Sequence, residues 1–131
     1  MISASENTLK VAQQAFTHFQ HGLATGAWQG FLDMLTEDFT FWFPLGKFHG
    51  WNQGKARAEE FFQYVSASFK NGLTLNLDRL TSNETTVIFE FRDEGTLLEK
   101  AYRNRVAVAF DVRGDKICGY REYFGSDGIS S

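Results

Sequence analysis

The sequence has 131 residues, of which 43% are hydrophobic and 22% charged, and its formal net charge at pH 7 is −3. This length fits a single domain spanning residues 1–131, with enough apolar surface to form a core. Basic and acidic residues are interspersed, so the composition argues against a nucleic-acid partner. No apolar run approaches the roughly 18 residues that a membrane span requires, so we expect no membrane partner.

The residues that usually hold metals or cofactors are sparse. Cys118 is the only cysteine, which excludes an intrachain disulfide framework and a multi-cysteine metal site. His18 and His21 have a metal-compatible spacing but no evident third ligand. The glycines of Gly46–Gly54 lack the spacing of a phosphate-binding loop. We therefore expect no metal and no cofactor, and the polar Met1–Lys10 segment, without a signal-peptide pattern, predicts a cytoplasmic protein.

The first half of the chain has mostly helical periodicity. A capping box at Ser3–Glu6 predicts the start of a long helix, whose apolar stripe has steps of three and four residues: Leu9, Ala12, Phe16, Phe19 and Leu23. The same spacing over Trp28–Leu35 predicts a shorter helix. Phe39–Phe43 is a β-prone run, and we expect a loop over Gly46–Gly54. A third helix is predicted over Lys55–Lys70.

The second half of the chain alternates apolar and polar residues. This period of two predicts four strands near residues 73–78, 87–92, 101–110 and 117–124. Turn-forming residues separate them at Ser82–Glu84, Asp93–Gly95 and Arg113–Asp115, which is typical of an antiparallel meander. The order of helix, helix, strand, helix and then four strands predicts an α+β domain.

Three stretches carry a family resemblance: LATGAWQGFLDMLTEDFTFWFP (23–44), GKARAEEFF (54–62) and YRNRVAVAFDVRGDKICGYREYF (102–124). Together they resemble the SnoaL-like family of the nuclear-transport-factor-2-like superfamily, to which ketosteroid isomerases also belong. The resemblance implies a cystatin-like cone, with a strongly curved, mostly antiparallel sheet wrapped around a long N-terminal helix and two further helices. It also implies a conical pocket and, by the habit of the fold, a homodimer formed through the outer face of the sheet.

In such a fold, one face of the strands lines a cavity, and the more apolar sets of residues are the better candidates for that face. Trp51, in the glycine-rich loop, would form an aromatic lid over the cavity or, alternatively, anchor a solvent-facing turn to the third helix. The expected ligand-binding wall consists of Phe16, Phe19, Phe43, Trp51, Phe89, Phe91, Tyr120 and Phe124. A filled aromatic core explains the same pattern. The arginine-rich opposite faces are expected outside or at a subunit contact, because buried unpaired arginine is costly.

Four polar residues share the apolar faces: Tyr102, Asn104, Tyr120 and Glu122. Because their strands are joined by a short turn, Asn104 and Glu122 are expected to be cross-strand neighbours. A carboxyl group among aromatics has a raised pKa, which suits a general acid or base. We therefore name Glu122, Tyr102 and Asn104 as candidate catalytic residues. The alternative is a structural Glu122 that hydrogen-bonds Asn104 or a tyrosine and holds the sheet ends together.

The resemblance also implies where active relatives carry their chemistry. At the ketosteroid-isomerase positions for the base, the oxyanion-binding tyrosine and the acid, this chain has Phe43, Phe19 and Val106. Gly125 stands where SnoaL-type cyclases carry an acid, and Ala107 stands where a limonene-epoxide-hydrolase-like Arg-x-Asp would need its aspartate. None of these three mechanisms is expected in its known form.

Three functions remain from the sequence. The first is binding of a small, largely apolar molecule in a conical pocket. The second is an enzyme, an isomerase, cyclase or hydrolase, that uses Glu122 as general acid or base with a tyrosine polarising an oxygen. The third is a non-catalytic structural dimer with a filled core.

Overall fold

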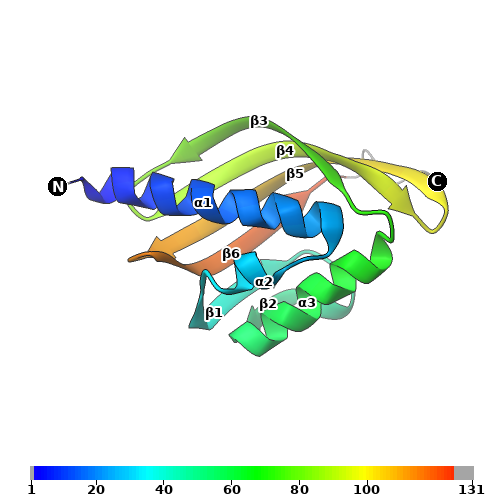
Figure 1. The fold of residues 1–131 in the computed structure, drawn as a ribbon, viewed down its shortest axis with the longest axis horizontal. Coiled ribbons are helices and arrows are strands. Elements are labelled where there is room, and N and C mark those ends of the chain that lie inside the picture. Colours follow the sequence, from blue (N-terminus) through cyan, green and yellow to red (C-terminus); the bar gives the residue numbers. More distant parts are fainter. Residues whose placement is uncertain (1, 126–131) are drawn as a thin grey trace.

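Residues 2–125 are described by a computed structural model (Figure 1). In chain order the elements are α1 (Ala4–Thr25), α2 (Gln29–Leu32), β1 (Leu35–Phe43), the 3-10 helix η1 (Gly46–Phe48), β2 (Gly50–Gln53), α3 (Lys55–Ser68), β3 (Thr74–Ser82), β4 (Thr86–Leu97), β5 (Lys100–Arg113) and β6 (Lys116–Phe124). Helices and a mostly antiparallel sheet are both present, so the predicted α+β class is confirmed.

The six strands form one sheet in the order β2-β1-β6-β5-β4-β3. All neighbouring pairs are antiparallel except β1 and β6, which are parallel. Helix α1 lies over the part of the sheet formed by β3–β6, whereas α3 packs over β1 and β2 (Figure 1). The curved sheet and the helices thus enclose the interior of the cone on one side of the sheet.

Helix α1 is defined by its caps. The Ser3 hydroxyl accepts a hydrogen bond from the Glu6 backbone N–H at 3.2 Å, as the capping box predicts. The helix ends at Gly26, whose φ of 82° is in the left-handed region that favours glycine. Trp28 then folds back against α1, where a Cβ on Gly22 would come within 2.4 Å of the indole. The indole N–H donates to Ser66 Oγ at 2.7 Å and so links this turn to α3.

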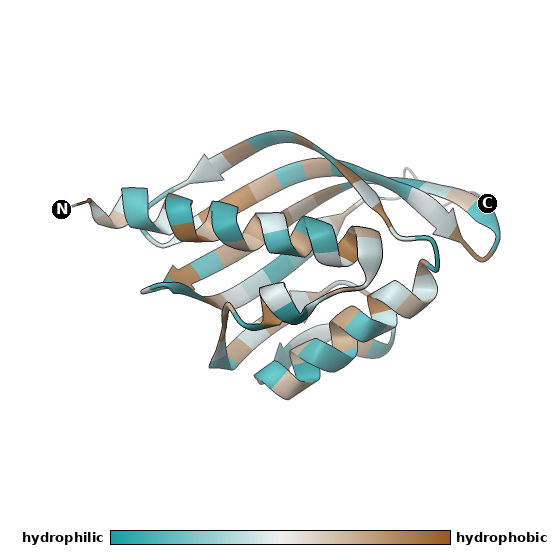
Figure 2. Cartoon of the chain, viewed as in Figure 1, coloured by the Kyte–Doolittle hydropathy of each residue, from teal (hydrophilic) through white to brown (hydrophobic). Residues whose placement is uncertain are grey.

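The core is aromatic and lies between α1 and the inner sheet face. Apolar and polar residues alternate along the strands, as Figure 2 shows. Phe16 of α1 stacks on Phe89 of β4 with ring centroids 4.2 Å apart, and Phe110 of β5 packs against both. These three rings are at most 6% exposed. Burial of each such side chain contributes about 2–3 kcal/mol, so this cluster is the main packing unit under α1.

The structure corrects three details of the sequence prediction. The helix predicted over Trp28–Leu35 spans only Gln29–Leu32, and Leu35 is the first residue of β1. Residues 93–95 are not a turn: β4 continues through them to Leu97, and the chain reverses at Leu98 and Glu99, which have positive φ values of 51° and 66°. The predicted loop over Gly46–Gly54 contains η1 and the short strand β2, which pairs with β1. A two-residue hairpin turn with positive φ at both positions usually contains Asn, Asp or Gly, whereas Leu98 and Glu99 occupy it here, so the sequence gave no turn signal.

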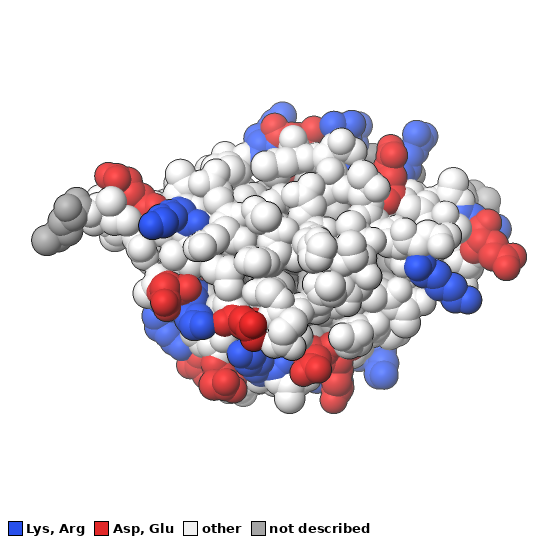
Figure 3. Space-filling model, viewed as in Figure 1, with Lys and Arg blue, Asp and Glu red and all other residues white. Residues whose placement is uncertain are grey.

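Charged residues lie around the margin of the face shown in Figure 3, which has few of them near its centre. This is the face covered by α1 and α3 in Figure 1. Within residues 2–125, no helix is both long and apolar enough to cross a membrane.

Candidate functional site

A cavity of about 270 Å³ lies inside the cone, between the inner sheet face and the helices α1 and α3. Helix α1 contributes Phe19 and Leu23, α3 contributes Phe61 and Phe62 among others, and Phe69 directly follows α3. The sheet contributes residues of β1, β4, β5 and β6. Most of the wall is aromatic or aliphatic, which is typical of a small-molecule site.

The expected aromatic wall is only partly at this cavity. Five of the predicted ligand-binding residues line it: Phe19, Phe43, Phe91, Tyr120 and Phe124. Phe16 and Phe89 instead fill the solid core by stacking on each other. Trp51 lies on β2 opposite Trp42 and is 67% exposed, so it does not line this cavity as a lid would.

Glu122 and Tyr120 face the cavity together from β6. They are two residues apart, so the strand places both side chains on the same face. The Tyr120 hydroxyl donates a short hydrogen bond to Glu122 Oε1. Removal of the Glu122 carboxyl from bulk water raises its pKa to about 7, although the tyrosine hydrogen bond acts in the opposite direction. Burial next to this carboxyl also raises the pKa of Tyr120 well above its ordinary value.

A second carboxyl group, Asp93, lines the same cavity from β4. Its side chain is 6% exposed, and its Oδ1 atom has no hydrogen-bond partner within residues 2–125. Burial raises the pKa of Asp93 to about 7. The negative charge of Asp93 in turn helps to raise the pKa of Glu122, so the two groups influence each other's ionisation.

Sequence reasoning missed Asp93 because it assigned residues 93–95 to a turn. A signal was present: Val87, Phe89 and Phe91 alternate at every second position, and Asp93 is the next residue on that face. The structure continues the strand and therefore keeps the register.

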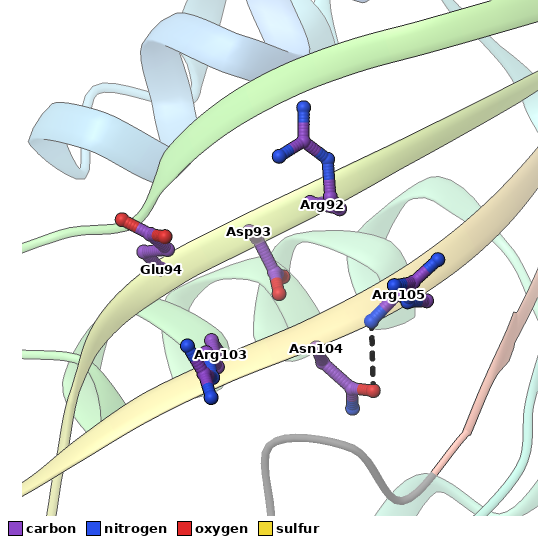
Figure 4. Close-up of a pocket in the computed structure, with 6 residues that line it drawn as sticks. All are labelled: Arg92, Asp93, Glu94, Arg103, Asn104 and Arg105. Carbon is purple, nitrogen blue, oxygen red and sulfur yellow. Dashed lines mark hydrogen bonds between the residues drawn. The ribbon is translucent and has the colours of Figure 1, made fainter.

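Tyr102 and Asn104 lie on β5, the strand that pairs with β4 next to Asp93. Asn104 is the cross-strand partner of Asp93, and Figure 4 shows the two side by side. The Asn104 amide Nδ2 donates to the Tyr102 hydroxyl at 3.2 Å, while its Oδ1 accepts the Arg105 backbone N–H at 2.9 Å. Tyr102 lines the cavity, and burial raises its pKa to about 12. Asn104 thus positions Tyr102 from behind the cavity wall.

The predicted pairing of Asn104 with Glu122 is wrong. The cross-strand partner of Glu122 is Val108, four residues further along β5 from Asn104. The register between β5 and β6 is set by their connecting turn and by an irregularity at Asp111/Val112, which alternation alone does not reveal. Glu122 instead bonds Tyr120, the type of tyrosine contact that the structural alternative had anticipated.

Basic side chains are kept out of the cavity. Among the described residues that line it, Asp93 and Glu122 carry charge, and none is Lys, Arg or His. Arg92 bonds Asp78, and Arg121 bonds Asp111, across strands. A separate open depression of about 390 Å³ is lined by Arg92, Asp93, Glu94, Arg103, Asn104 and Arg105 (Figure 4).

None of the three imidazole groups is part of the described wall of this cavity. His18 of α1 lies against Gly30, where an added Cβ would come within 2.5 Å of its Nδ1 atom. In the part of the chain that the structure describes, no three His, Cys, Asp or Glu side chains are grouped so that they could hold a metal ion.

The family model for the SnoaL-like domain matches residues 16–120, which include α1 from Phe16 onward and the chain up to Tyr120 of β6. The chain belongs to the SnoaL-like family. Among curated proteins, no sequence matches this SnoaL-like chain. A solved NTF2-like protein from Anabaena variabilis is 71% identical, with a TM-score of 0.93, and the match covers 100% of this chain and 98% of that one.

Other solved structures share the fold at low sequence identity. An LEH-like epoxide hydrolase from M. tuberculosis is 14% identical with a TM-score of 0.73, and the match covers 98% of this chain and 86% of that one. The epoxide hydrolase/cyclase-like enzyme SalBIII, which has a role in pyran ring formation in the polyether salinomycin, is 19% identical with a TM-score of 0.73. The match covers 89% of this chain and 92% of that one. At such identities these structures establish the shared cone alone.

Proposed function

We propose that this SnoaL-like protein binds a small, largely apolar molecule in the cavity between α1, α3 and the sheet. The observation that carries the proposal is a space of about 270 Å³ with mainly aromatic walls and a few polar groups. That combination provides affinity through the walls and orientation through the polar groups. The same space argues against the alternative of a non-catalytic dimer with a filled core.

The size of the cavity limits the ligand to about the size of a two-ring compound. A ligand that removed about 200 Å² of apolar surface from water would gain about 5 kcal/mol, from which the cost of immobilising it must be subtracted. Because 1 mM affinity corresponds to about 4 kcal/mol, a dissociation constant on the order of 1 mM is the expected value for a simple aromatic probe.

A suitable test measures binding of the neutral, fluorescent compound (2-naphthyl)methanol. Ser68 lines the cavity from α3, so Ser68→Phe fills part of the space. The matched control is Ala67→Phe, which adds the same ring at an exposed position one residue earlier. We expect Ser68→Phe to weaken binding at least tenfold and Ala67→Phe to leave it unchanged. Equal binding by both variants, or no binding by the unmodified protein, would contradict the proposal.

Proton transfer is the second candidate function. It is favoured by the bond between the Tyr120 hydroxyl and Glu122, together with the raised pKa of Glu122, about 7. Near neutral pH, both the acid and the base form of such a carboxyl are populated, and a tyrosine hydroxyl can polarise a substrate oxygen. Isomerisation, cyclisation or addition of water each require this pair of roles. The positions at which ketosteroid isomerases carry their groups are Phe19 and Phe43 here, so a steroid mechanism of that form is not proposed.

The variant Glu122→Gln separates the two candidates. For an enzyme, loss of the carboxyl should reduce kcat by at least about a hundredfold, the usual contribution of a general acid or base. For a binding protein, the same change should weaken binding by less than tenfold. A converted ligand identified by mass spectrometry, with conversion unaffected by Glu122→Gln, would exclude Glu122 as the proton-transfer group.

We also propose a homodimer formed through the outer face of the sheet. Trp42 of β1 stacks on Tyr123 of β6 there, with ring centroids 5.3 Å apart. Trp51 of β2 is the cross-strand neighbour of Trp42. Tyr123 and Trp51 are 49% and 67% exposed, an unusual amount of aromatic surface for a sheet face in water. Sedimentation should find a dimer for the unmodified chain and a monomer for Tyr123→Glu, with Leu98→Asp on the β4–β5 turn as control. A monomeric unmodified chain would contradict this proposal.

A further inference from the structure

The described wall of the cavity contains acidic side chains but no basic ones. Asp93 and Glu122 are the charged residues among those described in its wall, and no Lys, Arg or His is there to neutralise them. The salt bridges that the structure forms near this region join Arg92 to Asp78 and Arg121 to Asp111 instead. Both carboxyl groups of the cavity therefore lack a cationic partner in its wall.

Asp93 is the more demanding of the two groups. Its side chain is 94% buried, being 6% exposed, and Oδ1 has no hydrogen-bond partner within the described part of the chain. A buried polar atom that makes no hydrogen bond costs free energy in the native state, and a buried carboxylate without a counter-charge costs more. Such groups cluster at functional sites, where a ligand can supply the missing partner.

The aromatic wall adds a second preference of the same sign. Tyr102 and Phe69 face the cavity as a tilted pair with ring centroids 4.9 Å apart, and Phe91 lies on β4 two residues before Asp93. Aromatic faces carry partial negative charge and attract cations, more strongly when water is excluded. An aromatic wall next to an unpaired carboxyl thus disfavours an anionic ligand and favours a cationic one.

We propose that the ligand of this cavity is a small apolar cation, an alkyl- or arylammonium, whose N–H groups bond the carboxylates of Asp93 and Glu122 while its hydrocarbon part lies against the aromatic wall. This inference rests on the proposed function and specifies the class of ligand. The cation supplies the counter-charge and the hydrogen-bond donors that the wall lacks, and two carboxyls can share the donors of one ammonium.

The proposal predicts how binding depends on pH. The titratable groups that share the cavity wall with Asp93 are Tyr102 on β5, Tyr120 and Glu122 on β6, and Tyr64 on α3, whereas α1 adds none. Asp93 also borders the separate depression, whose charged groups are Arg92, Glu94, Arg103 and Arg105. Both tyrosines on the sheet have pKa values raised by burial and stay neutral near pH 7. The carboxyls, with pKa values of about 7, are protonated below that pH and must lose protons to hold a cation. Affinity for an ammonium therefore falls as the pH is lowered through 7.

Three matched probes test this inference on the full chain: (2-naphthyl)methylamine, (2-naphthyl)methanol and 2-naphthoate. Near pH 8 we expect the amine to bind at least tenfold more tightly than the alcohol, and the carboxylate to bind most weakly. Between about pH 8 and pH 6 the amine should lose at least tenfold in affinity, about tenfold for each carboxyl that titrates near 7 and must be ionised to hold the cation, while the alcohol changes little.

Two variants locate the effect. Asp93→Asn keeps the shape of the side chain but removes its charge, so the preference for the amine should fall at least tenfold while the alcohol still binds. Asp78→Asn makes the same change at the Arg92 salt bridge and should keep the preference. Thermal unfolding of both variants verifies that they are folded.

The outcomes separate this inference from the proposed function. If the alcohol binds and the amine is not preferred, or if 2-naphthoate binds best, the cationic ligand class is wrong and the apolar cavity still stands. If Asp93→Asn keeps the full preference for the amine, Asp93 is not the anchor and the inference is overturned. If none of the three probes binds, the proposed function itself fails.

Discussion

The inner face of β4 differs between its two ends, although the strand is continuous. At one end Phe89 is 1% exposed and stacks on Phe16 in a solid core. Four residues further on, Asp93 faces the same way but lines a cavity and has an unpartnered oxygen. The first end stabilises the fold through packing, whereas the second retains a costly carboxyl. This contrast indicates that the fold separates its stabilising core from its candidate site along a single strand face.

The largest expected effect is at the packed end of β4. Phe89→Ala removes a ring that is 1% exposed and stacked on Phe16, so it should destabilise the protein by about 3–4 kcal/mol. The Phe124 ring already lines the cavity, so Phe124→Ala removes fewer packing contacts. It should lower the free energy of unfolding by about 1–2 kcal/mol. Urea unfolding of both variants measures the difference. Equal losses would mean that the two ends are packed alike.

A smaller and opposite effect is expected at the cavity end. The pKa of Asp93 is raised to about 7 in the folded state and is near 4 in an unfolded chain. Between these values the folded state binds more protons, so the free energy of unfolding falls as the pH rises from about 4 to above 7. Asp93→Asn should therefore raise stability at about pH 8 by roughly 1–3 kcal/mol and have little effect at about pH 4.

Urea unfolding at the two pH values tests this prediction, with Asp78→Asn as the matched control. Asp78 lies outside the cavity, and its bond to Arg92 lowers its pKa, so its loss should not stabilise the protein at high pH. If Asp93→Asn destabilises the protein at both pH values, its carboxyl is well satisfied in the fold and the contrast along β4 disappears.

The smallest effect is expected at Trp51, outside both regions. Its side chain is 67% exposed on β2, so Trp51→Ala should change the stability of the monomer by less than about 0.5 kcal/mol. Binding of (2-naphthyl)methanol should also be unchanged, because Trp51 is not part of the cavity wall. Fluorescence titration checks this directly, and a tenfold loss of binding would restore the idea of an aromatic lid.

The sequence predicts the fold better than it predicts the site. Helical spacing from Leu9 to Leu23 predicts α1, because a helix buries one stripe wherever its partner lies. Inward faces of strands also follow from alternation, so Phe91, Tyr120 and Glu122 are assigned to one face correctly. Alternation does not say where along a face the packing stops. The sequence predicts both Phe89 and Phe91 in the cavity wall, yet of the two only Phe91 lines the cavity.

Strand ends and register account for the remaining differences. Asp93 follows the alternation of β4 but also begins an Asp-Glu-Gly stretch that is typical of a turn. The reversal lies at Leu98 and Glu99, which have no such signal. The offset between β5 and β6 likewise places Val108 opposite Glu122 and leaves Asn104 opposite Asp93. These features depend on tertiary pairing, which local sequence patterns do not encode.

Two desolvated carboxyl groups in one apolar cavity, Asp93 and Glu122, are the central feature of the candidate site. Carboxyl-carbon NMR titration of the protein, with Asp93→Asn and Glu122→Gln used to assign the resonances, measures their ionisation individually. We predict that both titrate near pH 7, as their burial requires, and that removing Asp93 lowers the pKa of Glu122. Titration of both groups near their ordinary values, about 4, would show that the cavity does not desolvate them and would contradict the central claim.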